Sequence, residues 1–242
     1  MRSLDKSRTK QKQPGGPPIF CIGMNKCGTT SLHEMFRASG LRSVSSGHAK
    51  MRPAAQTMFN NLSACRPLLT GLERFRAFSD INFLSPRVYL DAHVLFARLD
   101  RENPGAYFIL NTRPKADWLR SRAEHVSPRG RSFAERFAKA FEVKPEEVEA
   151  IWSEQWDRHH AAVREHFAGR DERFLEFDIS SDDPERLATF LAPYRLSTDR
   201  WGVHNATDAR PAKGARPARR GGDKKGRKGP RKGKRAPGQG RG

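Results

Sequence analysis

The sequence predicts an α/β fold of three layers, with a central parallel sheet between two layers of helices. Short apolar runs, at residues 19–22 and 107–110, alternate with segments whose apolar residues recur at helical spacing. The runs are continuously apolar, which is typical of parallel strands that are buried on both faces. The chain has 242 residues, of which 36% are hydrophobic, so it can bury one sizeable core and we expect one folded domain.

The first half of the chain contains the clearest local pattern. The apolar run at residues 19–22 leads directly into a glycine-bounded turn, and a helix with Leu32, Met35 and Phe36 follows and ends at Gly40. A second strand, a helix over residues 54–64 and a weak strand over residues 75–78 come next. Pro86 suits a first helical position, so we expect a third helix from Pro86 to Leu99.

The second half begins with Asn103-Pro104-Gly105, a strong turn signal. The strand at residues 107–110 runs into Asn111-Thr112-Arg113-Pro114, and a helix with Trp118 packed against the sheet follows. Two helical segments broken near Pro145 are expected over residues 131–168, and His159 and His160 are expected to pack there between helical faces. A strand over residues 174–177 and a helix over residues 184–191 complete the fold.

The basic charge of the chain lies mainly at its two ends. Of 46 basic and 27 acidic residues, positions 205–242 hold 14 and 2 and positions 1–17 hold 5 and 1, which leaves 27 and 24 for positions 18–204. The last segment consists largely of Gly, Pro, Lys and Arg and cannot bury enough apolar surface to offset its ordering entropy. We therefore expect a flexible basic arm over 1–17, one domain over 18–204 and a disordered basic tail over 205–242.

Several protein classes are disfavoured by composition. The three cysteines have no CxxC pair and no histidine at metal-ligand spacing, so neither a disulfide framework nor a metal site is indicated. No window approaches the roughly 20 apolar residues that a membrane span needs, and the run at residues 19–22 is too short for a signal peptide. We expect a soluble, cytoplasmic protein.

The first chemical motif is the turn at residues 23–31, which reads Gly-Met-Asn-Lys-Cys-Gly-Thr-Thr-Ser. Two glycines allow the backbone to curl so that its N–H groups surround one hollow at the positive end of a helix, which suits phosphate or sulfate. A nucleoside triphosphate loop reads GxxxxGK[ST], but here Thr29 takes the place of that lysine and the only lysine is Lys26. The alternative is a strand-to-helix turn whose glycines serve packing alone.

The second motif is Arg113 with Ser121, eight positions apart. The arginine ends the strongest strand, where parallel α/β sheets bind ligands, so it would lie beside the glycine loop if the two strands are neighbours. A guanidinium fork can hold a terminal phosphate and a hydroxyl on the next helix can complete the contact. Taken singly, Arg113 could be a surface ion-pair residue and Ser121 a plain helix position.

Together the two motifs resemble those of sulfotransferases that use 3′-phosphoadenosine 5′-phosphosulfate (PAPS), and the resemblance extends over residues 18–192. It implies a P-loop-like fold and transfer of a sulfuryl group to a hydroxyl or amine acceptor by in-line displacement, leaving adenosine 3′,5′-bisphosphate, with no metal. It assigns Lys26 to the bridging oxygen and Arg113 and Ser121 to the 3′-phosphate. It assigns the remaining loop contacts on the 5′-phosphosulfate to Asn25, Cys27, Gly28, Thr29, Thr30 and Ser31. The late Arg-Lys-Gly segment of cytosolic members recurs at residues 227–229 within the low-complexity tail, and we interpret it as a coincidence.

A base that takes the acceptor's proton must lie within hydrogen-bond reach of the transferred group. Asp80, at the end of a predicted strand, is the first candidate, although aspartate before Asn82 and Pro86 is also good turn chemistry. His48, in a polar loop after the second strand, is a weaker candidate and could simply be exposed.

Two other functions stay open. A P-loop kinase with a displaced lysine would need ATP and magnesium. A non-enzymatic protein could bind polyanions weakly through its basic tail, with a steep salt dependence. The acceptor, whether a small molecule, a lipid or a carbohydrate, and the oligomeric state are not indicated by the sequence.

Overall fold

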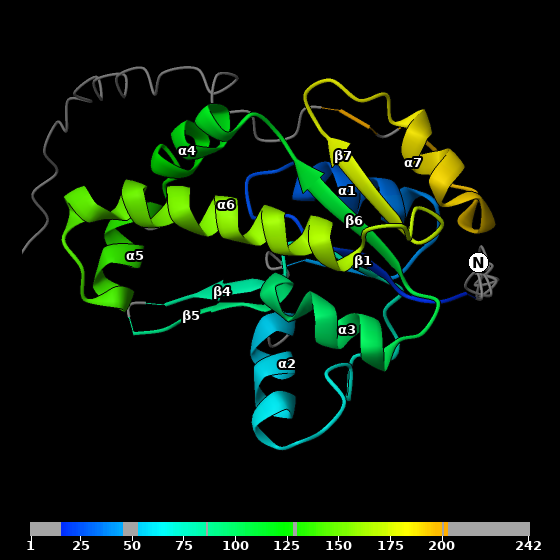
Figure 1. Ribbon diagram of the computed structural model, residues 1–242, viewed down its shortest axis with the longest axis horizontal. Helices are drawn as coiled ribbons and strands as arrows, with labels where there is room; N and C mark the ends of the chain where they lie inside the picture. Colours follow the sequence, from blue (N-terminus) through cyan, green and yellow to red (C-terminus); the bar gives the residue numbers. More distant parts are fainter. Residues whose placement is uncertain (1–15, 46–52, 86, 128–129, 200, 203–242) are drawn as a thin grey trace, which may run out of the picture. The chain divides into compact units, whose positions relative to one another are not determined.

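Five strands form one sheet in the order β2-β3-β1-β6-β7, and each neighbouring pair is parallel (Figure 1). The structure is a computed structural model that describes residues 16–45, 53–85, 87–127, 130–199 and 201–202. The strands are β1 Ile19–Cys21, β2 Ser43–Val44, β3 Ala77–Phe78, β6 Tyr107–Thr112 and β7 Phe174–Asp178. Because the strands run in one direction, their carboxyl ends meet at one edge of the sheet.

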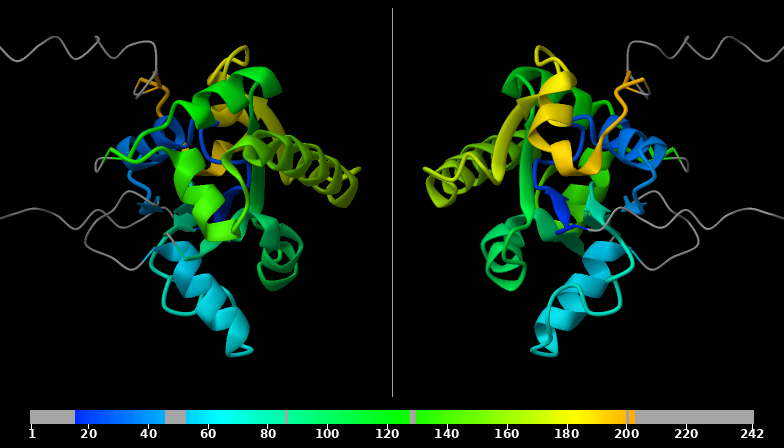
Figure 2. Two further views of the ribbon diagram at one scale, coloured as in Figure 1. Left: turned by 90° about the vertical axis from the view of Figure 1, so that its left-hand side faces the viewer. Right: turned by 90° about the vertical axis from the view of Figure 1, so that its right-hand side faces the viewer.

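Helices cover both faces of this sheet, and the two views of Figure 2 show α1 on one side and α6 on the other. The helices are α1 Thr29–Ala38, α2 Ala54–Ser63, α3 Phe96–Glu102, α4 Lys115–Ala123, α5 Phe133–Phe141, α6 Val148–His166 and α7 Glu185–Phe190. Among the described residues there are also three short 3₁₀ turns: η1 Ala92–Leu95 before α3, η2 Pro145–Glu147 between α5 and α6, and η3 Ala192–Tyr194 after α7. The predicted three-layer α/β fold is therefore confirmed.

The side chains of β1 alternate between two cores. Phe20 packs in a cluster that includes residues of α2, α3 and α6, whereas Ile19 and Cys21 pack in a second cluster with residues of α1 and α7. All three are essentially fully buried, and burying one large apolar side chain stabilises a fold by about 1.5–3 kcal/mol. Packing on both faces fixes β1, and with it the start of the loop that follows.

A third cluster continues this packing beyond the sheet. Met24 and Cys27, both from the loop after β1, are buried against aromatic side chains of α4, α5 and α6, among them Trp118, Phe133 and Trp152. The loop therefore has an apolar underside that belongs to the core.

The region around residue 90 differs from the prediction of one helix from Pro86 to Leu99, and that prediction is wrong. Tyr89–Asp91 is a strand, β5, paired antiparallel with β4 Asn82–Leu84, and α3 begins only at Phe96. Alternate residues of this hairpin pack on α2 and α5, so tertiary packing outweighs the helical spacing. Pro86 itself lies outside the described residues.

Other predicted elements agree with the structure within a few residues. The break near Pro145 is confirmed by η2, which separates α5 from α6. The weak strand predicted over residues 75–78 is shorter and covers only Ala77–Phe78.

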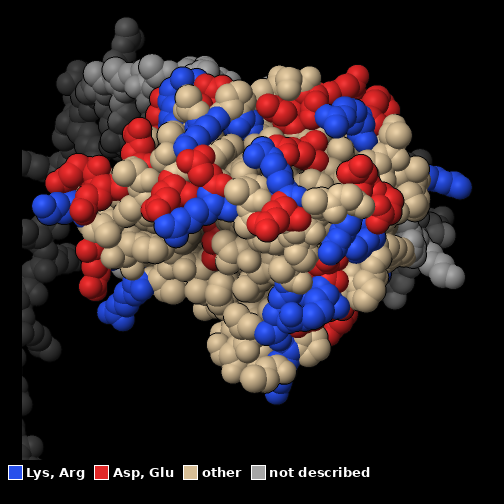
Figure 3. Space-filling model, viewed as in Figure 1, with Lys and Arg blue, Asp and Glu red and all other residues tan. Residues whose placement is uncertain are grey.

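All described residues lie within one compact unit, Met1–Arg210. Charges of both signs intermingle on the face of this unit shown in Figure 3. Within the described part of the chain, none of the helices combines the length and the apolar character needed to cross a membrane.

Candidate anion-binding site

One buried side chain braces both ends of the loop between β1 and α1. Asn111, in β6, is fully buried; its Oδ1 accepts the N–H of Gly23 at 3.0 Å and its Nδ2 donates to the carbonyl of Cys27 at 2.7 Å. This role of Asn111 was not predicted from the sequence. A polar residue inside the most apolar strand was the signal that could have revealed it, because a buried amide must find partners.

Two further carbonyls of the loop are held from the helices. The indole Nε1 of Trp118, in α4, donates to the carbonyl of Asn25 at 2.9 Å. The ring Nε2 of His159, in α6, lies 2.7 Å from the carbonyl of Ile22. Burial is the main cause that lowers the pKa of His159 to about 2, so the ring is neutral at pH 7 and donates this bond.

Arg113 meets the same loop from the end of the neighbouring strand. β1 and β6 pair in parallel, as the predicted approach of Arg113 required, and Nη1 of Arg113 donates to the carbonyl of Lys26 at 3.3 Å. Its Nε is buried and has no hydrogen-bond partner among the described residues. Because the side chain is only half-buried, this unpaired N–H can donate a hydrogen bond to an anion bound at the loop.

The two glycines of the loop serve different requirements. A Cβ at Gly23 would lie 1.8 Å from the carbonyl oxygen of Asn111, so only glycine allows β6 to approach this closely. Gly28 has a φ of 68° and a Cβ there would lie 2.8 Å from Ile179. Packing therefore requires glycine at both positions, in addition to the curvature of the loop.

The start of α1 satisfies the physical conditions for binding an anion. No side chain caps the helix at Gly28, and the first turn has no acidic residue. No carbonyl in the described part of the chain accepts the N–H groups of Cys27, Gly28, Thr29 or Thr30. With the loop carbonyls held elsewhere, these amides and the helix dipole are left for a negatively charged group.

The hydroxyl of Ser31 has a protein partner in this structure. It donates to the carbonyl of Gly202 at 2.6 Å, and the adjacent Trp201 packs edge-on against Phe177 with ring centroids 5.5 Å apart. Residues 201–202 therefore lie against the first turn of α1. The predicted contact of Ser31 with the phosphosulfate would require this hydroxyl to change partner.

Ser121 lies in α4, three residues after Trp118 and hence on the same side of the helix. No hydrogen bond among the described residues joins it to the loop, so its assignment stays a prediction. Trp118 is fully buried, as expected for a residue that anchors its helix, and the indole also touches the loop.

The two predicted bases have different outcomes. Asp80 follows β3, the neighbour of β1, at the carboxyl edge of the sheet, with a φ of 49°. Its Oδ1 accepts the side-chain amide of Asn82 at 2.5 Å and its carbonyl accepts the Asn82 N–H at 2.9 Å, so the turn chemistry is present. His48 lies outside the described residues.

An aspartate–histidine pair beside the Asp80 turn was not predicted from the sequence. The carboxylate of Asp91 contacts Nδ1 of His93, and the N–H of Ala92 donates to the carbonyl of Ile81, which places this pair beside the turn at Asp80. The His93 ring lies 4.4 Å from that of His159, which holds the loop. The short Asp91-Ala92-His93 stretch was hidden because the segment was read as a helix.

Cys27 contributes packing rather than reactivity. Burial raises the pKa of its thiol to about 12, against the smaller lowering effect of Arg113 and Arg122, so the thiol is protonated at neutral pH. In the described ranges, no three His, Cys, Asp or Glu side chains are grouped so that they could hold a metal ion.

A comparison with known protein families matches residues 18–193 of the chain to the sulfotransferase domain. The chain belongs to the sulfotransferase domain family. The matched span contains the loop, Arg113, Ser121 and Asp80, and family membership supports sulfuryl transfer as the general activity of this domain. No curated protein sequence matches the chain.

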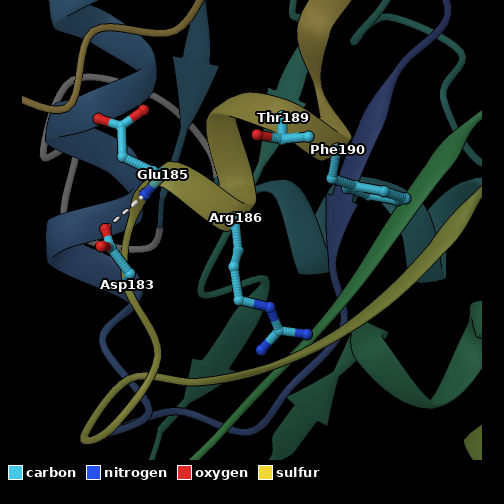
Figure 4. A pocket seen from close by; sticks show the side chains of 5 residues that line it. All are labelled: Asp183, Glu185, Arg186, Thr189 and Phe190. Atoms are coloured by element: carbon cyan, nitrogen blue, oxygen red, sulfur yellow. Dashed lines mark hydrogen bonds between the residues drawn. The ribbon is translucent and has the colours of Figure 1, made fainter.

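The sulfotransferase domain also has a hollow on the outside of α7 (Figure 4). It is lined by Asp183, Glu185, Arg186, Thr189 and Phe190. None of these residues belongs to the loop or to the two predicted clamp residues, so we keep the candidate site at the carboxyl edge of β1 and β6.

Proposed function

We propose that this sulfotransferase takes its sulfuryl group from PAPS and transfers it to a hydroxyl or amine. The observation that carries the proposal is the way the loop is held, with four of its carbonyls bonded to side chains of β6, α4, α6 and Arg113. Such a loop is organised before its ligand arrives, so binding costs little ordering entropy. Its unbonded amides stand beside Arg113, which matches a donor with phosphate groups at both ends.

In the proposed reaction the acceptor oxygen or nitrogen attacks sulfur while the bond from sulfur to the phosphate oxygen breaks. Negative charge then grows on the bridging oxygen and stays on the 5′-phosphate of the leaving adenosine 3′,5′-bisphosphate. Lys26 and the amides of the first turn of α1 stabilise this charge. Removing one donor of this type typically costs about 3 kcal/mol of transition-state stabilisation.

Arg113 binds the 3′-phosphate in this proposal, with Ser121 completing the contact from α4. The unpaired Nε of Arg113 supports the assignment, because the donor would supply the missing acceptor. Asp80 accepts the proton of the acceptor group; its place after β3 puts it at the same edge of the sheet as the loop. The acceptor, whether a small molecule, a lipid or a carbohydrate, is held by residues beyond this edge.

The proposal is tested by following the melting temperature during titration with adenosine 3′,5′-bisphosphate and, separately, with ATP and magnesium. We expect a selective rise with the bisphosphate that is lost in Arg113→Ala. Arg120→Ala is the matched control, because Arg120 is an exposed arginine of α4 that pairs with Asp117. It should bind the bisphosphate as the wild type does.

A preference for ATP with magnesium would favour a kinase of the P-loop type and overturn the PAPS assignment. Equal rises in Arg113→Ala and wild type would leave the nucleotide site but remove Arg113 from it. Release of the bisphosphate from PAPS in the presence of phenolic and sugar acceptors then tests the transfer step itself.

A further inference from the structure

One positive charge in this domain is buried almost without partners. Arg122, in α4, is 1% exposed and is among the largest fully buried side chains. Its Nη2 donates to the hydroxyl of Tyr89 at 2.9 Å, whereas Nε and Nη1 have no hydrogen-bond partner among the described residues. The hydroxyl of Tyr89 in turn donates to Asp91, so a carboxylate is reached only through an intermediate.

Aromatic rings surround this guanidinium. Its central carbon lies 4.6 Å from the ring centroid of Trp152 and 4.9 Å from those of Trp118 and Phe133. The rings come from α4, α5 and α6, so three helices converge on one side chain. Cation–π contacts offset part of the free energy needed to remove the charged guanidinium from water.

The stability of the fold does not explain this arrangement. A buried charge without a direct counter-ion costs more than aromatic contacts recover, and replacing buried ionic groups by apolar ones of similar volume is often neutral or stabilising. A methionine would fill the same box and leave fewer buried donors unpaired. An arginine at this position therefore points to a functional role for its charge.

The aromatic box is built onto the candidate donor loop. Trp118, which stacks on the guanidinium, donates to the loop carbonyl of Asn25, and the loop residues Met24 and Cys27 pack in the same cluster. The charge of Arg122 also acts on Cys27, where it partly offsets the effect of burial on the thiol pKa. Arg122 thus lies behind the loop, on the side toward which the Asn25 carbonyl points.

We propose that Arg122 is a positioning residue of the donor site, a fixed buried charge that orients the loop through Trp118 and favours binding of a polyanionic nucleotide. A positive charge behind the loop attracts the carbonyl ends of its peptide groups, and the N–H ends then face the donor. The same charge lowers the electrostatic cost of bringing several negative charges to the loop. The inference rests on the proposed function, since it concerns the same nucleotide.

The experiment compares Arg122→Met, which keeps the volume, with Arg122→Lys, which keeps the charge. Dissociation constants are measured by calorimetry for adenosine, adenosine 5′-monophosphate and adenosine 3′,5′-bisphosphate. We expect Arg122→Met to melt at or above the wild-type temperature but to bind the bisphosphate about tenfold more weakly, with a smaller loss for the monophosphate and none for adenosine. Arg122→Lys should recover part of the bisphosphate affinity.

Arg120→Met is the matched control, because it removes a charge from the surface of the same helix and should bind all three ligands as the wild type does. If Arg122→Met binds the bisphosphate as tightly as wild type, or weakens all three ligands equally, Arg122 has only a structural role. If Arg122→Met does not fold, Arg122→Gln replaces it, because the amide removes the charge and keeps a polar group within the box for the Tyr89 hydroxyl. An unchanged bisphosphate affinity in that variant would overturn the proposal.

A wild-type protein that does not bind the bisphosphate at all would instead overturn the proposed function. The two failures are therefore distinguishable in one titration series.

Discussion

Replacing Asn111 by alanine should both destabilise the domain and weaken nucleotide binding. The side chain is fully buried and makes two hydrogen bonds, to the N–H of Gly23 and the carbonyl of Cys27. Alanine leaves both groups buried without this partner, at about 1–3 kcal/mol each. We expect the free energy of unfolding to fall by about 4 kcal/mol, which most domains of this size survive.

Nucleotide binding weakens in Asn111→Ala because the loop is no longer held in place before the ligand binds. Without Asn111 the backbone between Gly23 and Cys27 must be ordered by the ligand, and ordering even one residue costs about 1–2 kcal/mol. The dissociation constant for adenosine 3′,5′-bisphosphate should therefore rise by about tenfold or more. Asn111→Asp, which keeps the acceptor for Gly23 but faces the Cys27 carbonyl with an oxygen, should behave similarly.

Asn61 provides a matched control. It is a buried asparagine of α2 whose Nδ2 donates to the carbonyls of Leu68 and Thr70, at 3.0 and 2.9 Å, away from the candidate site. Urea unfolding and calorimetry on both alanine variants separate the two effects. If Asn111→Ala loses stability like Asn61→Ala but keeps wild-type affinity for the bisphosphate, binding does not depend on a loop that Asn111 organises in advance.

Three further predictions concern the same domain. His159 has a pKa of about 2 in the folded state, so below about pH 6.5 the unfolded chain binds a proton that the folded chain excludes. The free energy of unfolding should therefore be constant above about pH 6.5 and lower by about 2 kcal/mol at pH 5. In urea unfolding measured across this pH range, His159→Gln should remove this decrease. Because Lys26 has a φ of 70°, Lys26→Gly should be about 1 kcal/mol more stable than Lys26→Ala, whereas both variants should release bisphosphate from PAPS about a hundredfold more slowly than the wild type. Glu142→Gly, at a φ of 56° after α5, should leave the rate of release unchanged. Removing residues 205–242, which hold 14 basic and 2 acidic residues, should leave the affinity for the bisphosphate unchanged and lower the salt concentration at which the protein elutes from a heparin column. Loss of nucleotide binding would instead place donor contacts in that segment.

The parts of this domain that the sequence predicted are those with local signals. The strand, glycine loop and helix at residues 19–38 are consecutive, and each has its own composition, so their order alone fixes the place of the loop. Arg113 was predicted to reach the loop from chain order and strand direction, and the pairing of β1 with β6 agrees. These inferences needed no knowledge of side-chain packing.

The parts that were missed depend on contacts between distant residues. The hydrogen bonds of Asn111 to the loop join positions 84 and 88 residues apart, and no local pattern specifies such partners. The β4–β5 hairpin was read as part of a helix because its apolar residues also fit helical spacing over a short window. No local pattern singled out Arg122, since most of the rings that enclose it, among them Phe133 and Trp152, come from other helices.

Backbone strain gives independent support for the two residues to which we assign chemistry. Five non-glycine residues among those that the structure describes have positive φ, namely Lys26, Cys65, Asp80, Glu142 and Arg195. Glu142 and Arg195 come directly after α5 and η3, and Cys65 comes two residues after the end of α2; a left-handed residue at such a position is an ordinary way to end a helix. Lys26 and Asp80 follow the neighbouring strands β1 and β3, where no helix ends.

Such a conformation costs about 1–3 kcal/mol away from helix ends and persists only where the surroundings impose it. At Lys26 the bond from Arg113 to its carbonyl does so, and at Asp80 both bonds to Asn82 do. Strain at these two positions is therefore what a site that holds an amine and a carboxylate in place would require.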